Sequence, residues 1–281
     1  MATQSRSSVS QDLILAARQG LIPASTSRRL GGFRNLFNKE LGEWFATRRW
    51  LIQGLIWLVI INGMMAFVMF VAPTFDTSAA MSPTEALTEG LGIFFGFTTV
   101  FGSIGMVILA QDEIIGEKQS GTAAWVLSKP IARPAFVLTK FFSNLIAAAL
   151  IILIVPGVVA YGEIYLKSGI ALPVGPYIAG WGVVLIGLIF FLALTLMLGT
   201  LFDQRGPVLG IAAAVFLGGQ IFAQFLPQVG YVLPVNINNI AIFVTMGQPL
   251  PPLAISQLAS AVILSLVFIV VALWRFGREE F

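Results

Sequence analysis

Six long stretches of the chain carry apolar residues without charge, and the charged residues gather between them. A helix needs about 20 apolar residues to cross the hydrocarbon core of a bilayer. The pattern therefore predicts six membrane-spanning helices, near residues 50–73, 91–111, 141–161, 176–202, 207–226 and 253–274.

The segment between the last two predicted spans, residues 227–252, is uncharged and contains five prolines and three asparagines. Backbone at membrane depth must hydrogen-bond within the protein or line a cavity. We therefore expect short re-entrant or interfacial helices here, before the sixth span.

Composition agrees with a membrane location. The 281 residues are 57% hydrophobic and 10% charged, whereas a soluble domain carries about 25% charged residues. We expect an all-α polytopic membrane protein, with a single transmembrane domain over residues 33–281. Residues 1–32 are expected to form a mobile cytoplasmic segment, and no cleavable signal peptide is evident.

Basic residues orient the spans, because cytoplasmic flanks are enriched in Lys and Arg. With the N-terminus inside, all 16 Lys and Arg residues except Lys167 fall on one side. The pattern predicts a multi-pass protein of the cell membrane with both termini in the cytoplasm. It also accounts for the net charge of +3 without a nucleic-acid partner.

Several chemistries are excluded by residue type. The chain has no Cys and no His, which removes thiol and imidazole catalysis and the usual zinc, haem and iron–sulfur ligands. It has no Gly-Lys dipeptide and hence no P-loop for ATP. We expect no catalytic residue, no metal site and no bound cofactor in this chain.

Residues 33–49 form an amphipathic pattern directly before the first span. A helix here would place one broad apolar face in the cytoplasmic interface. That face consists of Phe33, Leu36, Phe37, Leu41, Trp44 and Phe45. The segment is interpreted as an elbow helix, which serves either as a plain membrane anchor or also as part of a surface for a cytoplasmic partner.

The loop between spans 2 and 3, residues 111–142, is the longest charged segment between spans. Gly121-Thr122 breaks the chain, with Thr122 as the expected N-cap of a short helix over residues 123–128. Lys129-Pro130 ends that helix, and Pro134 lies in the first turn of the next one. A short transverse helix with an exposed apolar side suits a groove on a soluble partner.

This loop resembles the permease signature of the second class of ABC exporters. The resemblance rests on Asp112-Glu113-Ile114, Glu117-Lys118, Gly121-Thr122, Leu127-Ser128-Lys129-Pro130-Ile131, Arg133 and Lys140, and on the six-span layout with its elbow helix. It implies that the short helix is a coupling helix, which docks on a separate ATPase subunit. It also implies two ATPase subunits that bind ATP and Mg, and a second permease subunit, identical or similar.

The residues expected to couple the permease to its ATPase lie in and beside the short helix. Glu117 would pair with a base on the ATPase or stabilise the loop, and Gly121 would permit the turn before Thr122. Trp125 and Leu127 would fill a groove on the partner, and Arg133 would brace the loop. The alternative is that the loop is only a positively charged tether between two spans.

Polar residues within the spans have two interpretations. Asn62, Gln220 and Gln224 either form hydrogen bonds between helices or line a substrate path. No ionisable residue lies near a predicted span centre, which disfavours proton- or sodium-coupled transport and favours an apolar or amphipathic substrate. A stand-alone channel or secondary carrier remains an alternative function, as does a non-transporting ABC-like sensor; an intramembrane enzyme is disfavoured.

Overall fold

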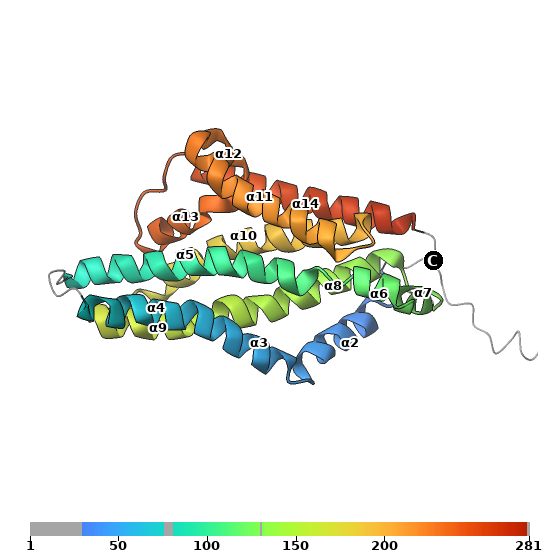
Figure 1. Ribbon diagram of the computed structural model, residues 1–281, viewed down its shortest axis with the longest axis horizontal. Helices are drawn as coiled ribbons and strands as arrows, with labels where there is room; N and C mark the ends of the chain where they lie inside the picture. Colours follow the sequence, from blue (N-terminus) through green and yellow to red (C-terminus); the bar gives the residue numbers. More distant parts are fainter. Residues whose placement is uncertain (1–29, 76–80, 130, 280–281) are drawn as a thin grey trace, which may run out of the picture.

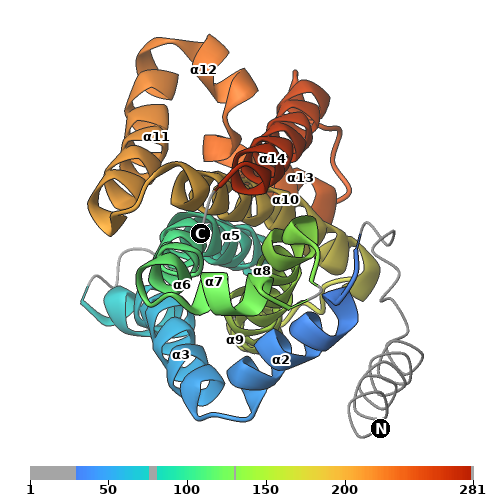
Figure 2. The same ribbon diagram turned by 90° about the vertical axis from the view of Figure 1, so that its right-hand side faces the viewer.

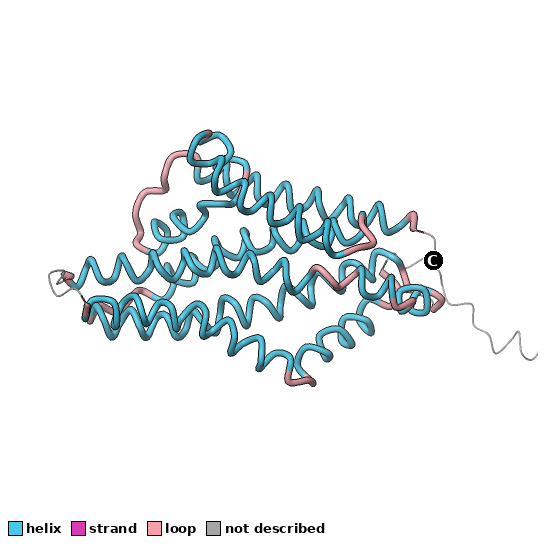
Figure 3. The backbone as a smooth tube through the Cα atoms, viewed as in Figure 1, coloured by secondary structure: helices cyan, strands magenta, loops and turns pink. Residues whose placement is uncertain are grey.

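The chain folds into a bundle of long helices. A computed structural model describes residues 30–75, 81–129 and 131–279, and no strand occurs in these ranges. Figures 1 and 3 show the long helices side by side along one axis, with short helices at one end and along one flank. Most of the expected mobile N-terminal segment, and Pro130 of the loop, lie outside the described residues.

Six helical stretches are long and apolar enough to cross a membrane: Arg49–Thr74, Pro83–Gln119, Arg133–Ser168, Val174–Leu201, Arg205–Phe225 and Ala254–Gly277. The predicted number of spans is therefore confirmed, and the chain is a multi-pass membrane protein. Below, these stretches are called spans 1 to 6.

The elements run along the chain in the following order. The first described helix is α2 (Phe33–Phe45). Span 1 follows it and contains α3 (Arg49–Leu58), η1 (Val59–Gly63), α4 (Met64–Ala66), η2 (Phe67–Val71) and η3 (Ala72–Thr74). Span 2 contains α5 (Pro83–Ala110) and α6 (Ile115–Gln119), and α7 (Thr122–Leu127) follows it. Span 3 contains α8 (Arg133–Ala148), η4 (Ala149–Ile154) and α9 (Val155–Ser168). Spans 4 and 5 are α10 (Val174–Leu201) and α11 (Arg205–Phe225), and α12 (Pro227–Val232), η5 (Pro234–Asn236) and α13 (Ile237–Thr245) precede span 6, α14 (Ala254–Gly277).

Spans 2 and 3 are longer than the apolar pattern predicts. Span 2 starts at Pro83 because Ser82 and Glu85 form a capping box: Ser82 N donates to Glu85 Oε2 at 2.7 Å, and Glu85 N donates to Ser82 Oγ. Span 3 starts at Arg133 and ends at Gly169, whose φ of 69° closes the helix in the left-handed region. Polar turns thus extend both helices beyond their apolar centres.

A helix, α2, forms in the segment predicted to be an elbow helix, but it is shorter than expected. It ends at Phe45 rather than at residue 49, and a turn over residues 46–48 leads into α3. Its inward face carries Leu36, Glu40 and Trp44, all buried, whereas Phe45 is exposed. The expected apolar face is therefore wrong in part, because a carboxylate occupies its centre.

Spans 1 and 3 contain wide helical turns and meet at a polar contact. Pro156 has no N–H and its ring crowds the carbonyl four residues earlier, which explains the π-helical turn η4 just before it. Asn62, within the π-helical turn η1, donates from Nδ2 to the Pro156 carbonyl at 3.0 Å. Asn62 therefore makes the hydrogen bond between helices that was one of its two interpretations.

Span 4 is the centre of the bundle. α10 packs against α5, α13 and α14, and Figure 2 shows it lying between these helices. Gly180 of α10 lies so close to α13 and α5 that an added Cβ would collide with Thr245 and Phe95. A glycine here allows the close approach of the helices.

Short helices occupy the segment before span 6, as predicted. α13 packs against α10 and α5, and in Figure 1 it lies alongside the spans rather than beyond their ends. Side-chain amides bind backbone carbonyls between α12 and α13, where regular helix is interrupted. Gln220 Nε2 donates to Val235 O at 2.8 Å, and Gln257 Nε2 donates to Leu233 O at 3.1 Å. These bonds meet the requirement that irregular backbone within a bundle be satisfied by protein groups.

Candidate functional site

The short helix α7 stands at one end of the bundle, beyond the long helices (Figure 1). We call this the α7 end. The chain reverses there because Gly121 adopts a φ of 72°, in the left-handed region, where a Cβ is disfavoured. Gly121, not Thr122, is therefore the N-cap of α7, and the expected Thr122 cap is wrong: the Thr122 hydroxyl instead lies 2.9 Å from Ser120 Oγ.

α7 has one buried side and one open side. Ala123 and Val126 are buried, and Leu127 packs partly against the core. Trp125 is 62% exposed, and the Lys129 ammonium lies 3.5 Å from its ring centroid. Of the two apolar residues expected to meet a partner, only Trp125 is open, while Leu127 faces mainly inward.

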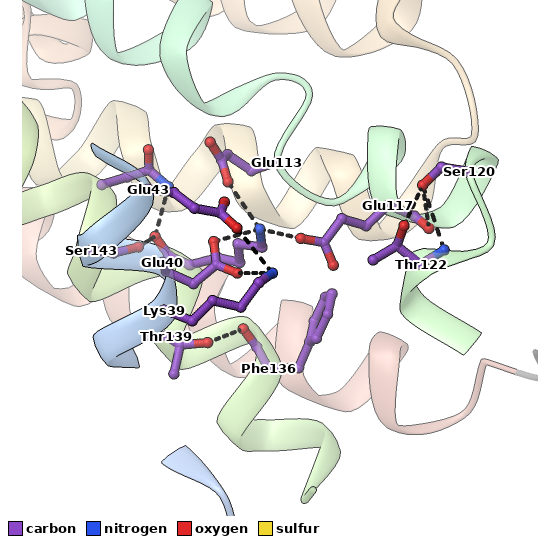
Figure 4. A network of polar contacts seen from close by, with 12 residues as sticks. Lys39, Glu40, Glu43, Glu113, Glu117, Ser120, Thr122, Phe136, Thr139 and Ser143 are labelled. Atoms are coloured by element: carbon purple, nitrogen blue, oxygen red, sulfur yellow. Dashed lines mark hydrogen bonds and ion pairs between the residues drawn. The ribbon is translucent and has the colours of Figure 1, made fainter. Parts of the chain in front are cut away.

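A buried ion cluster at the α7 end is built around Lys140 of α8, and Figure 4 shows Glu40, Glu113 and Glu117 converging on its ammonium. Lys140 is 3% exposed, and its Nζ lies 2.6 Å from Glu40 Oε2 and 3.3 Å from Glu113 Oε2. It also pairs with Glu117 Oε1. One ammonium thus joins α2, the α6 end of span 2 and span 3.

The geometry of α2 explains how Glu40 reaches this cluster. Leu36, Glu40 and Trp44 are spaced by four residues and share one helix face, which packs against α8. Glu40 is 4% exposed, so its carboxylate is as deeply buried as the apolar residues beside it. A buried carboxylate needs a charged partner, and Lys140 supplies it.

The cluster contains more negative than positive charge. Three carboxylates contact Lys140, and the nearest further cation is Lys39, whose Nζ lies 3.6 Å from Glu40 Oε1 and 3.2 Å from Glu43 Oε1. Partial burial opposes the charge of Lys39, but the hydrogen bond to Glu43 and the nearby Glu40 outweigh this and raise the pKa of Lys39. Each cation is therefore tightly held by acids, and neutralising Lys140 would leave buried carboxylates unpaired.

A second group of polar contacts ties α6 to the loop after span 4 and to the C-terminal end of span 6. Lys118 Nζ lies 2.8 Å from Asp203 Oδ1 and 2.7 Å from Glu279 Oε1. The hydrogen bond and positive charge of Lys118 lower the pKa of Asp203. Gln119 Nε2 also donates to the Asp203 carbonyl at 2.7 Å, so the turn before α7 is fixed to two further parts of the bundle.

Arg133 takes part in a different contact from the one expected. Its Nη1 donates to the carbonyls of Gly277 and Glu279, each at 2.8 Å. The Gly277 carbonyl ends α14, where free acceptors favour a cation, and Glu279 follows two residues later. Arg133 therefore links the start of span 3 to the C-terminal end of span 6 rather than bracing the loop before α7.

The structure places the predicted residues in three groups. Glu117, Gly121, Thr122 and Trp125 lie in or beside the α7 end, as the sequence suggested. Asn62 and Gln220 lie elsewhere and bind backbone carbonyls of neighbouring elements, whereas Gln224 is exposed on α11. Gln220 thus makes a hydrogen bond between elements, one of its two interpretations.

Sequence reasoning missed Glu40 altogether and gave Lys140 no structural role. The available signal was the position of Glu40 between Leu36 and Trp44, since a charge at the centre of an apolar stripe requires a buried partner. Among the described residues, no group of three or more His, Cys, Asp or Glu side chains is arranged to hold a metal ion. Lys140, not a metal, gathers the acids of the cluster.

Six spans, short helices before the sixth and a charged α7 end define a multi-pass helical membrane protein. Residues 49–281 match a protein family described as a protein of unknown function, DUF2705, and the chain belongs to that family. No curated protein matches the sequence.

Proposed function

We propose that this chain is the membrane-spanning permease subunit of an ATP-driven ABC exporter of the second class. The observation that carries the proposal is the setting of α7: this short helix connects spans 2 and 3, buries Ala123 and Val126 and exposes Trp125 on its other side. The loop also holds the residues that resemble the permease signature of that class. Its exported substrate would be apolar or amphipathic.

The buried cluster supports a role in transmitting force. Lys140 holds α6, α8 and α2 together through ion pairs in which the Lys140 and Glu40 side chains are buried and the Glu117 side chain is 17% exposed. Salt in the solvent screens buried ion pairs only weakly. Closely packed elements that are linked by such pairs transmit a displacement from one to the next. A push on α7 would therefore displace spans 2 and 3 and the elbow helix as one unit.

ATP and Mg would be bound by the partner, since the sequence has no P-loop. Two ATPase subunits would dock beneath two permease subunits, and closure of the ATPases on ATP would move the α7 end. The path for substrate would open and close between the permease subunits. In this arrangement both termini and α7 face the cytoplasm of a cell membrane, and the chain itself carries out no covalent chemistry.

Two alternatives predict different behaviour. A stand-alone channel or secondary carrier would transport without ATP when purified alone, and a non-transporting sensor would bind an ATPase without moving substrate. Proton coupling is disfavoured because the ionisable side chains of the long helices lie toward helix ends: Glu113, Glu117 and Lys140 at the α7 end, and Glu163 near the end of α9.

The test is affinity purification of the full-length chain from its native membrane, followed by ATPase assay of what co-purifies. The proposal predicts a soluble P-loop ATPase whose hydrolysis is stimulated by the chain. Recovery of the folded chain without any ATPase, or with an ATPase that the chain does not stimulate, would overturn it.

A further inference from the structure

A groove of about 360 Å³ lies between the elbow helix and α7. From α2 it is lined by Asn35, Leu36 and Lys39, and from the α7 side by Trp125, Val126 and Lys129. Its two walls are about ninety residues apart in sequence, so the fold, and not a local loop, creates it.

The walls of the groove are fixed to each other. Ala132 N donates to the Gly31 carbonyl at 3.0 Å. Gly32 adopts a φ of 80°, and an added Cβ there would lie 2.9 Å from Ile131 Cγ1. The N-terminal end of α2 and the turn after α7 are thus in close contact, and the groove is a preformed feature of the α7 end.

The chemistry of the groove is apolar at its base and basic at its rim. Leu36 and Val126 are buried, while the Trp125 ring and the half-exposed Lys39 side chain border the opening. No carboxylate is among the described residues that line it, but Glu40 and Glu43 pair with Lys39 from just outside, so Lys129 supplies the uncompensated charge of the rim. Lys129 makes no ion pair within the described ranges and rests on the Trp125 ring.

These features indicate which kind of protein segment the groove would bind. A basic rim over an apolar base complements a carboxylate next to an apolar or aromatic side chain, and an exposed tryptophan beside a cation is a typical anchor of a protein interface. The chain's own N-terminal segment is unsuited, because residues 1–29 carry four arginines and one aspartate. α7 and the N-terminal end of α2, which line the groove, lie at the α7 end of the bundle (Figure 1).

We propose that the groove between α2 and α7 receives a segment of the ATPase partner that carries a carboxylate beside an apolar or aromatic side chain, with Lys129 binding the carboxylate. This inference rests on the proposed function and extends it. The elbow helix then forms half of the docking surface. The contact pairs a basic group of this chain with an acidic group of the partner.

The experiment uses the full-length chain purified with its ATPase. A photo-cross-linking residue replaces exposed Asn35, inside the groove, and in a separate variant replaces Ala124, on the open side of α7. The cross-linked partner peptides are identified by mass spectrometry. We expect the Asn35 probe to capture an ATPase peptide with Asp or Glu next to an apolar residue.

Charge variants provide the second measurement. Lys129→Glu should weaken ATPase binding by about tenfold or more, whereas Lys129→Arg should retain it and Lys167→Glu, at the opposite end, should not change it. Replacing the captured acidic residue by Lys should restore binding of Lys129→Glu. Thermal unfolding of each variant verifies that the fold is intact.

The outcomes separate the two proposals. If the ATPase co-purifies and the Ala124 probe captures it, but Lys129→Glu binds normally, the docking inference is wrong while the proposed function stands. Capture at Asn35 of lipid, the chain's own N-terminal segment or a second copy of the chain would also overturn the inference. If no ATPase co-purifies with the wild-type chain, both proposals fail.

Discussion

Lys140 and Glu40 are one hundred residues apart in the sequence, yet their side chains form an ion pair with 2.6 Å between Nζ and Oε2. Both residues are at least 96% buried. The pair links the elbow helix to span 3 at the α7 end, and Glu113 and Glu117 complete it from span 2. The proposed coupling through α7 depends on this link, because it ties α2, span 2 and span 3 together at the α7 end.

Replacing Lys140 by Met should destabilise the protein by about 3–5 kcal/mol, because it leaves buried carboxylates without a cation. Thermal unfolding in detergent measures the change, and Lys167→Met is the matched control, with an expected effect within about 0.5 kcal/mol. The double variant Lys140→Met/Glu40→Gln should recover part of the loss. A Lys140→Met protein as stable as wild type would refute the structural role of the cluster.

Gly121→Ala should impose a left-handed backbone on alanine, at a cost of about 1 kcal/mol, although no atom lies within 4 Å of the added Cβ. Gly169 provides a close control, since it has a φ of 69° and equally open surroundings but lies at the opposite end of span 3. Both variants should lose similar stability. Only Gly121→Ala should reduce the ATPase stimulation, and equal effects of the two on stimulation would count against coupling at α7.

Trp125→Ala should leave the unfolding temperature nearly unchanged, because the side chain is 62% exposed. It should nevertheless weaken the binding of the ATPase, measured as the amount recovered on the immobilised chain, by tenfold or more if Trp125 is an interface anchor of about 2 kcal/mol. Leu166→Ala, 77% exposed at the other end, is the control. Normal ATPase binding by Trp125→Ala would exclude α7 as the docking helix.

Asp203 gives a pH dependence with a definite sign. Lys118 holds the pKa of folded Asp203 below its ordinary value, so the contact stabilises the fold above the unfolded pKa of about 3.9. That contribution is lost as the pH falls through the lower, folded pKa. Asp203→Asn should therefore lower the unfolding temperature at pH 7 and lose this effect in acid.

The Asp203 effect should be small and weakened by salt, because the carboxylate is 81% exposed. Unfolding temperatures measured across pH in low and high salt check both points. A deficit of Asp203→Asn that grows as the pH falls would contradict the assigned contact.

Gln257→Leu should destabilise the segment before span 6 by about 0.5–1.5 kcal/mol, because the Leu233 carbonyl loses one of its two donors and keeps only the Val235 N–H. Gln224→Leu, at an exposed position of α11, should change stability by less than about 0.5 kcal/mol. Hydrogen exchange of residues 233–245 in each variant measures where the protection is lost. Equal protection in both variants would show that the side-chain amide is not needed.

Much of the fold follows from local patterns in the sequence. Six apolar stretches predict the spans, Pro134 marks the start of α8, and Gly121 marks the turn before α7. These features depend on residues close together in the chain. The extra length of span 2 depends on a capping box at Ser82, which lies outside the apolar stretch and was therefore not predicted.

The candidate site was less predictable because its contacts join distant segments. Nothing in the sequence near Lys140 indicates that Glu40 is its partner, or that Arg133 binds the carbonyls at the end of α14. Packing of the elbow helix against α8 determines the first contact, and the placement of span 6 determines the second. Burial of a charge on an apolar helix face was the single clue to the cluster.

The most direct measurement is the ATP hydrolysis of the ATPase that co-purifies with the full-length chain from its native membrane, in parallel for wild type, Gly121→Ala and Gly169→Ala. The account predicts an associated P-loop ATPase, stimulated by wild type and by Gly169→Ala and poorly stimulated by Gly121→Ala. Absence of an associated ATPase, or equal stimulation by all three, would contradict it.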